Sequence, residues 1–578
     1  MLSIFEKMIA LGRFHNNKEE ERKMLLRYLC AVITLFTVMI SSAHVHDPRA
    51  LLATPETATG PIAPKLKGLG SHHFQITTTN QESQYFFNQG FRLTIGFNHS
   101  EALRAFKEAV RLDPNNAMAY WGWALALGPN LNLPMQADVV TQTYTAIQKA
   151  MSLKSGSTPR EQAYIEALAT RYSNKPQSDR SMLDKTYVAA MAKLVERYPD
   201  DLDAATLYAA AMMNTNPWDY WYKDGTPKHQ TELVIATLQS VIDRDKNHAG
   251  AHHYMIHVVE AFKPELGIDS ADQLGNLMPG AGHLVHMPSH IYMRVGRYAD
   301  SYKANALAVK ADSEYITQCR AQGLYPLGYY PHNLHFLTWS AMFQGRSQSA
   351  LEAARAVEKK IATASSGDTW GLFESFRSQP MFVMVRFGLW DRMLEEPQPE
   401  VNARFMNAIW HYGRGLALTK KDKLQQAKAE LTQLAEVIKL IKNDQAYIGF
   451  GAAETLLTIA EKILAGELAA KQNNFHDAIS YLEKAVRLED GLMYNEPPSW
   501  YFPVRHILGA VLLEAKLPGE AEVVYWEDLR RNPANGYSLF GLKQSLVMQN
   551  KSLVALEIEQ RLINAWQESD VNLTTSRY

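Results

Sequence analysis

The strongest constraint on the fold is a recurring order of small and large residues at helical spacing. A small residue on one helix opposite a small residue on the next lets the two backbones approach closely, and large apolar residues one turn away lock the pair. Proline then ends the unit. The first occurrence consists of Phe86, Gly90, Leu93, Ala102, Phe106, Ala109 and Pro114. This order predicts a helical hairpin.

The same order recurs, with drift, in the second half of the chain. The copies are Gly415, Leu418, Ala427 and Leu431; Gly466, Ala469, Ala478, Leu482 and Ala485; and Gly509, Leu512, Ala521, Tyr525 and Pro533. Weaker copies surround the turns at Gly296 and Gly345. The pattern resembles the tetratricopeptide repeat, a helix-turn-helix unit of about 34 residues. The resemblance covers roughly residues 83–565 and is poor over 125–280.

The resemblance implies an all-α fold, a TPR-like α-solenoid whose concave surface binds a ligand or a peptide. Pro397 and Pro399 cannot continue a helix. They predict a break between an N-terminal TPR-like lobe over 81–395, which holds a His-rich groove, and a C-terminal TPR lobe over 396–578. Residues 44–80 are rich in Thr, Pro, Gly and Ala and predict a flexible lead-in.

Residues 1–43 form the predicted signal peptide region. Arg27 provides a positive start, Tyr28 to Ile40 form an apolar run, and Ser41 and Ala43 fit a cleavage site. The true start could be Met24, because a long stretch with consecutive glutamates precedes the run. We expect export to a periplasmic or extracellular location. The alternative is an uncleaved membrane anchor over residues 24–43, although a full span needs about 20 apolar residues.

Composition narrows the classes further. With 46% hydrophobic residues the chain buries a large core, which excludes a disordered protein. The 59 basic and 60 acidic residues nearly cancel, so we expect no nucleic-acid partner. Two cysteines, Cys30 and Cys319, provide neither a disulfide framework nor a Cys-rich zinc module.

Histidines are concentrated in one stretch, with nine between His248 and His335. His253, His257 and Glu260 share one face of a predicted helix. If consecutive first helices stand side by side, the groups converge on one part of the groove. The candidate metal ligands are His253, His257, Glu260, His283, His286, His290, His332 and His335.

Two interpretations of these histidines stay open. Imidazoles with a carboxylate suit zinc, copper, nickel or iron, and two histidines plus an acid match a catalytic site with an open position. The sequence has no His-Glu-x-x-His motif, however, and nothing identifies a general base. The alternative is a metal-free polar pocket in which the histidines hydrogen-bond across helix pairs, so no cofactor is assigned with certainty.

Aromatic residues form a second feature, because Trp218, Trp221 and Tyr222 are too close together all to point inward. We expect at least one of them to reach the groove. The predicted ligand-groove residues are Trp218, Asp219, Trp221, His252 and Asn333.

The sequence supports two functions from different classes. The first is an exported bacterial-type TPR binding or scaffold protein that recognises a peptide, a protein segment or a small ligand in its concave groove. The alternative is a His-rich metalloprotein, which could be a metal-dependent enzyme, with the site inside the N-terminal lobe. Phosphate-loop, dinucleotide and nucleophile-elbow motifs are absent. No reaction is therefore identified, and a non-enzyme is favoured.

Export gives the first testable expectation. If the signal is cleaved after Ala43, the mature chain begins at His44. Intact-mass analysis of protein secreted by a host that processes such signals should show this start. A chain that retains residues 24–43 and stays in the membrane fraction would support the anchor instead.

Overall fold

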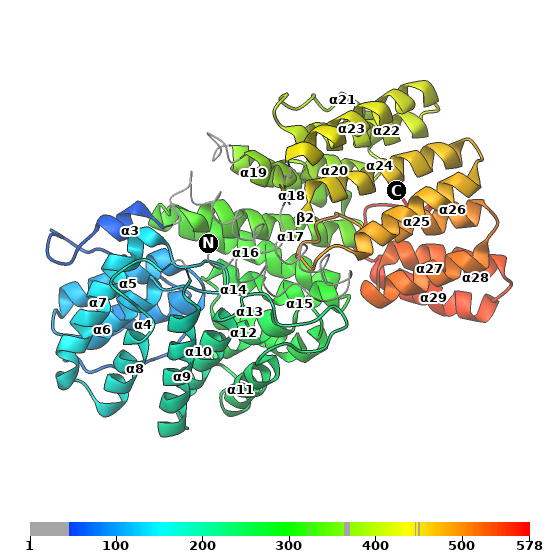
Figure 1. Ribbon diagram of the computed structural model, residues 1–578. Helices are drawn as coiled ribbons and strands as arrows, with labels where there is room; N and C mark the ends of the chain where they lie inside the picture. The colour runs from blue at the N-terminus through cyan, green and yellow to red at the C-terminus, as the bar shows by residue number, and fades with distance from the viewer. Residues whose placement is uncertain (1–45, 178, 322, 363–369, 445–446, 449–450) are drawn as a thin grey trace, which may run out of the picture.

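The computed structural model of the chain describes residues 46–177, 179–321, 323–362, 370–444, 447–448 and 451–578. Figure 1 shows an elongated array of helices, from the blue N-terminal helices at one end to the red C-terminal helices at the other. The predicted signal segment, residues 24–43, lies outside the described residues. The predicted all-α solenoid of helix pairs is confirmed.

Successive helices pack as pairs along the array. The first helices are α4 (Gln81–Ile95), α6 (Ala117–Ala126), α8 (Pro159–Ala169), α10 (Leu202–Asn214), α12 (Ala249–Val259), α14 (Gly282–His286) continued by α15 (Pro288–Arg294), α17 (Tyr330–Phe343), α20 (Gln379–Arg386), α22 (Arg404–Lys420), α24 (Ala453–Lys471), α26 (Arg505–Glu514) and α28 (Gly536–Met548). Their partners are α5 (His99–Leu112), α7 (Val140–Leu153), α9 (Ser181–Arg197), α11 (Thr231–Arg244), α13 (Ile268–Leu277), α16 (Tyr298–Cys319), α18 (Ser347–Ala362), α21 (Trp390–Glu395), α23 (Leu424–Asp444), α25 (Phe475–Asp490), α27 (Pro518–Arg531) and α29 (Ser552–Ala565).

Short elements join or precede these pairs. They are α3 (Pro48–Leu52), α19 (Trp370–Arg377), the 3-10 turns Ala137–Val139, Lys154–Gly156 and Pro264–Gly267, the π-helical turn Tyr325–Tyr329, and the antiparallel strands β1 (Tyr447–Ile448) and β2 (Gly451–Ala452).

Glycines set how closely the helices pack. A Cβ on Gly90 would lie 2.8 Å from the Phe106 ring, and one on Gly122 would lie 2.2 Å from it. Phe106 on α5 is therefore held between α4 of its own pair and α6 of the next. The ring fills the space that a side chain on either glycine would need, which fixes the distance between successive pairs.

Residues 46–80 differ from the predicted flexible lead-in. They form little regular structure, as expected, but Phe74 and Ile76 are buried. The backbone N–H groups of Phe74 and Ile76 donate to Asn88 and Gln84 of α4. Low helical periodicity predicted the absence of long helices but carried no information about this packing.

The division of the core also differs from the predicted boundary at residues 395 and 396. The chain does leave the helix between α21 and α22, as the prolines predict. One buried apolar cluster nevertheless runs from Met293 through Phe336 to Ile558, and a separate one covers Ala50 to Tyr329. The two cores therefore meet at α15 and α16, which contribute residues to both, and not at the prolines, because a proline can end a helix without ending the packing around it.

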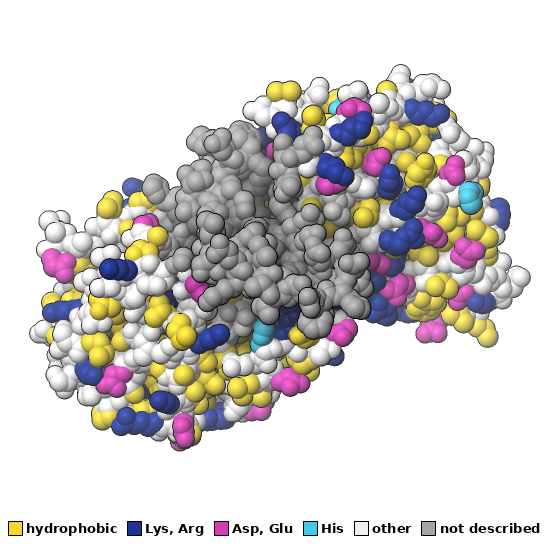
Figure 2. Space-filling model, viewed as in Figure 1, with side chains coloured by type: hydrophobic (Ala, Val, Ile, Leu, Met, Phe, Trp, Pro, Cys, Tyr) yellow, Lys and Arg dark blue, Asp and Glu magenta, His cyan; other side chains and the backbone are white. Residues whose placement is uncertain are grey.

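The surface view shows hydrophobic, basic and acidic side chains mixed over both ends of the molecule, and few histidines on the visible described part of this face (Figure 2). Within the described residues, no helix is both long enough and apolar enough to cross a membrane.

The glycine contacts can be tested by adding one methyl group. Gly122→Ala should lower the free energy of unfolding by about 1–3 kcal/mol, because the new Cβ overpacks against Phe106. The matched control is Gly156→Ala, where nothing lies within 4 Å of the added Cβ. Urea unfolding followed by circular dichroism should show the loss for Gly122→Ala alone. Equal stability of the two variants would contradict the packing described here.

Candidate metal centre

Successive first helices bring the histidines together. α12 carries His253 and His257, α14 carries His283 and His286, α15 carries His290, and α17 carries His332. α12 begins after His248, whose Nδ1 accepts the N–H of Ala251 at 3.1 Å and caps the helix. Pro288 lies in the first turn of α15, where it needs no hydrogen bond.

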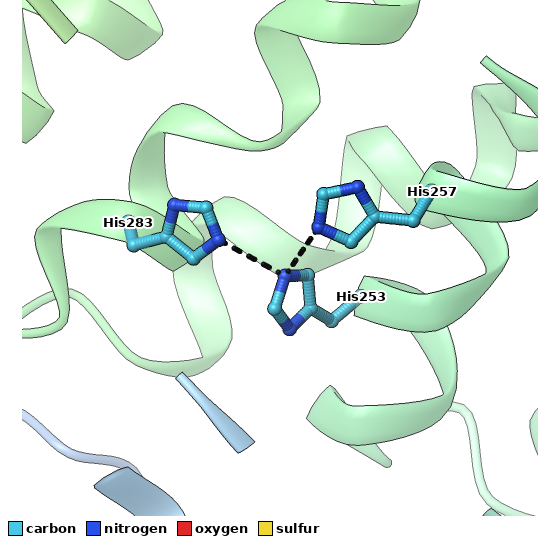
Figure 3. A group of neighbouring side chains, drawn as sticks. All are labelled: His253, His257 and His283. Carbon is cyan, nitrogen blue, oxygen red and sulfur yellow. Dashed lines mark hydrogen bonds between the residues drawn. The ribbon is translucent and has the colours of Figure 1, made fainter. Parts of the chain in front are cut away.

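His253, His257 and His283 form the first trio. The Nε2 atoms of His257 and His283 lie 3.1 and 3.2 Å from Nε2 of His253. Figure 3 shows the two dashed lines meeting at one nitrogen of His253, with His283 reaching it from the opposite side of the site. All three rings are buried. One ring nitrogen from each histidine therefore points to a shared position.

Hydrogen-bond partners determine the protonation of the first trio. His253 Nδ1 lies 2.7 Å from the carbonyl oxygen of Ile95. A carbonyl oxygen only accepts, so Nδ1 carries the proton and Nε2 of the neutral ring keeps a lone pair. His257 Nδ1 faces Glu260 Oε1 at 3.7 Å, which favours the same tautomer. Two lone pairs then face each other in the core.

His286, His290 and His332 form the second trio, in which one nitrogen from each ring lies within 4.8 Å of the others. The Nε2 atoms of His286 and His290 are 2.9 Å apart. His286 Nδ1 donates to Asn305 Oδ1 at 2.7 Å, because Asn305 uses its Nδ2 to donate to the carbonyl of Ser301. His286 Nε2 therefore also keeps a lone pair toward the shared position.

Two carboxylates orient these rings from behind. Glu260 Oε2 lies 3.0 Å from His290 Nδ1, and Glu260 Oε1 faces His257 of the first trio. Glu496 Oε2 lies 3.0 Å from the same His290 nitrogen. A carboxylate behind a ligating histidine fixes the ring and makes it a better donor. Glu260 serves one ring of each trio in this way.

Burial keeps most of these imidazoles in the form that binds metals. It holds the pKa of His253, His283, His286 and His332 well below the ordinary value. A neutral ring is the ligating form. His290 is different, because Glu260 and Glu496 outweigh the effect of burial and raise its pKa to about 10. In the absence of a metal ion, an imidazolium at His290 donates to His286.

The nitrogen separations match those around one ion. Two nitrogens about 2.0–2.1 Å from a metal are about 2.9 Å apart at a right angle and about 3.4 Å apart at the tetrahedral angle. The observed separations of 2.9, 3.1 and 3.2 Å fall in this range. Three imidazoles suit zinc, copper, nickel or iron and leave a coordination position open. Such a position can bind water or polarise an oxygen of a ligand.

The sequence missed two residues of the site. Glu496 lies in the segment between α25 and α26, more than 160 residues after the last histidine of the two trios, and no pattern around it points to the histidines. Phe97 packs against all three rings of the first trio, with ring centroids 4.4–5.6 Å apart. Its place after the glycine that ends α4 gives no sequence signal for a site.

Two of the selected histidines lie outside both trios. The ring of His335 packs edge-on against Phe376, with centroids 5.4 Å apart. Both ring nitrogens of His252 have partners, the hydroxyl of Ser270 and the carbonyl of Lys246. His252, expected in the ligand groove, is instead a buried residue that joins α12 to its neighbours.

The other predicted groove residues have different surroundings. Trp218 is partly exposed, donates to the carbonyl of Leu131 and stands edge-on to His257. Trp221 donates to the carbonyl of Val258, and Asp219 pairs with Lys228 at the surface. Asn333 is buried and donates to Asp312. Trp218 thus contacts the first trio, whereas a ligand-binding role for this set stays a prediction.

A further group, His72, Asp203 and His248, has a structural explanation. Because His248 Nδ1 accepts the N–H of Ala251, its Nε2 carries the proton and faces Asp203 at 3.3 Å. Asp203 also lies 3.0 Å from His72. This group fixes the start of α12 and leaves His248 without a free lone pair.

Comparisons with known proteins are limited to the fold. No protein-family model matches the chain, and no curated protein matches it. The human IFIT1 dimer with m7Gppp-AAAA is 11% identical over 85% of this chain and 91% of that chain, with a TM-score of 0.29. The Cut9–Hcn1 hetero-tetramer of the APC/C is 13% identical over 80% and 76%, with a TM-score of 0.27. The TPR domain of P58(IPK) is 12% identical over 81% and 99%, with a TM-score of 0.23.

Likenesses this distant carry no conclusion about a ligand or a reaction. The tetratricopeptide-type architecture of this chain rests on its own helix pairs and on the glycine contacts between them.

Asp312 packs against the start of α14, and its ionisation should make the stability of the protein depend on pH. It is fully buried, accepts from Tyr325 and Asn333 at 2.7 Å, and fits against Gly282 only because that residue has no Cβ. Burial raises the pKa of Asp312 to about 7, although its two hydrogen bonds oppose the shift. Because the folded pKa is raised, the stability that protonated Asp312 contributes is lost as the pH rises from about 4 through 7.

Asp312→Asn removes this titration. Relative to the parent protein, the variant should gain about 2–3 kcal/mol in free energy of unfolding between pH 5 and pH 8. Urea titrations at the two values measure the difference, with the exposed Asp243→Asn as control. Parallel pH profiles for the parent and Asp312→Asn would contradict this account of the site.

Proposed function

We propose that this chain is a metal-binding helical-repeat protein in which the two histidine trios hold transition-metal ions. The observation that carries the proposal is the surroundings of the Nε2 atom of His253. Its lone pair faces two other Nε2 atoms at 3.1 and 3.2 Å, while Ile95 holds the proton on Nδ1. A cation at the shared position satisfies all three nitrogens at once.

Proton placement without a metal ion satisfies the first trio less well. Nε2 of His253 can accept from one neighbour only. If His257 donates, its bare Nδ1 faces the carboxylate of Glu260. If His283 donates, Nε2 of His257 keeps a buried lone pair with no donor, because its Nδ1 carries the proton toward Glu260. A buried polar atom left unpaired costs about 1–3 kcal/mol.

The second trio has the geometry for a second ion, but its geometry also has an explanation that needs no metal. His290 as an imidazolium donates to His286 and satisfies that pair without a metal ion. The two explanations differ in the state of Nε2 of His290 at neutral pH. This nitrogen carries a proton in the metal-free explanation, and a bound metal ion would replace that proton.

Metal content gives the direct test. Chelator-free protein loaded with zinc, copper, nickel or iron should retain about two ions per chain after gel filtration, because each trio forms one three-nitrogen site. His253→Ala should lose about one ion and His286→Ala the other. His335→Ala is the matched control, since it removes a partly buried imidazole outside both trios and should retain both ions.

Elemental analysis of the parent protein and the three variants measures the number of bound ions per chain. Melting temperatures before and after addition of EDTA measure how much those ions stabilise each protein. Retention of one ion by the parent and by His286→Ala would assign an ion to the first trio alone and a proton to the second. Absence of bound metal, with no thermal stabilisation by any of the four ions, would remove the proposal.

Recognition of a ligand by the solenoid is a second candidate function. A cavity of about 630 Å³ lies between α9, α10 and α11 and is lined by Tyr208, Met212, Asn216, Tyr220 and Val234, among others. Asn216 and Tyr220 flank the predicted groove residues Trp218 and Asp219. Its mixed lining suits a small, largely apolar molecule with one or two polar groups.

We also propose that the protein is exported. The support is the sequence of residues 24–43, an apolar run after Arg27 that ends at a predicted cleavage site.

A further inference from the structure

The last part of the chain returns to the middle of its own lobe. After α29, Asp570 accepts the backbone N–H groups of Ser347 and Gln348 at the start of α18. The chain then runs back along the repeats, and its end lies near α24 and α26 rather than beside α29 (Figure 1). We call residues 572–578 the tail.

Two glutamates hold Arg577. Its Nη1 donates to Glu467 on α24 at 3.1 Å, and its Nη2 donates to Glu514 at the end of α26. Glu467 is almost fully buried and also accepts from Lys420 of α22 at 2.8 Å. Charge-assisted hydrogen bonds in such a setting are stronger and more selective than those between exposed ions.

The residues on either side of Arg577 also have specific partners. The hydroxyl of Ser576 donates to the carbonyl of His506 at 2.8 Å and lies 2.7 Å from the hydroxyl of Tyr525. The ring of Tyr578 lies edge-on to Trp390 and under the ammonium of Lys420. Three consecutive residues therefore occupy three subsites built by α21, α22, α24, α26 and α27.

We propose that this surface is a peptide-binding groove for segments with a serine, an arginine and an aromatic residue in succession, and that the tail occupies it in cis. The inference is separate from the metal proposal, since none of its residues belongs to either trio. The partner it fits is an extended basic-aromatic segment of another protein.

The tail is bound in a way that permits exchange. Residues 572–575 form no helix or strand, and Asn572 and Thr574 are exposed. The contacts of the tail described above are made by the side chains of Ser576, Arg577 and Tyr578. Release of the tail therefore breaks side-chain contacts but no helix or strand. Glu467 keeps Lys420 as a partner when Arg577 leaves. A tethered segment competes at an effective concentration in the millimolar range, so it masks the groove from weaker partners.

Removal of the tail tests the proposal. A chain that ends at Val571 keeps the Asp570 contacts and should bind a fluorescent acetyl-VNLTTSRY-amide peptide, measured by anisotropy, at least tenfold more tightly than the full-length protein. The amide cap makes the result independent of a terminal carboxylate. A peptide with glutamate in place of the arginine should bind at least tenfold more weakly.

A charge reversal in the groove provides the matched control. Glu514→Arg in the shortened chain should weaken peptide binding at least tenfold, whereas Glu557→Arg, an exposed site on α29, should leave it unchanged. If the shortened chain fails to fold, full-length Arg577→Glu serves in its place, because it releases its own tail without removing residues and should bind the peptide as the shortened chain would.

Three results overturn the proposal. The first is equal affinity of the full-length and released proteins for the peptide. The second is absence of binding by a released protein that circular dichroism shows to be folded. The third is unfolding of both released variants, which would make the tail a structural part of the lobe.

Discussion

The close approach of helices at glycine–ring contacts is the constraint on which the rest of the structure depends. Phe106 lies between Gly90 and Gly122, and Tyr525 lies between Gly509 and Gly541 in the same way. Each large side chain thus contacts two successive first helices and fixes their separation. The same stacking of helix pairs makes α12, α14 with α15, and α17 neighbours, which places histidines from separate stretches of sequence within reach of one another.

Burial and hydrogen bonding together set the protonation of the histidines in this core. Burial opposes protonation of the rings, so most of them stay neutral and keep a lone pair. Carbonyl, amide and carboxylate oxygens hold the Nδ1 protons of His253, His286 and His290, and the Nε2 atoms are left facing one another. Three of the resulting nitrogen separations, 2.9, 3.1 and 3.2 Å, fall in the range expected for two nitrogens on one metal ion. Glu496, in the segment before α26, contacts His290, so the C-terminal part of the chain reaches the histidines of the N-terminal repeats.

The C-terminal repeats hold a second polar arrangement. Glu467 is buried against Lys420 and Arg577, and Tyr525 contacts both Gly541 and Ser576. The aromatic residue that fixes the repeat spacing therefore also supports the tail.

The sequence by itself determined the helix-pair architecture, because small and large residues at helical spacing report directly on which helices pack closely. It also determined that His253 and His257 of α12 and the C-cap residue Glu260 lie on one side of the helix, since that follows from helical geometry alone. It did not separate His335 from the histidines of the two trios, or His252 from the ligand groove, because the partners of a ring nitrogen come from other parts of the chain. Only the tertiary structure decided the division of the core, the packing of residues 46–80, the place of Glu496 and the course of the tail. Each of these depends on contacts between residues far apart in the chain, and local periodicity carries no information about such contacts.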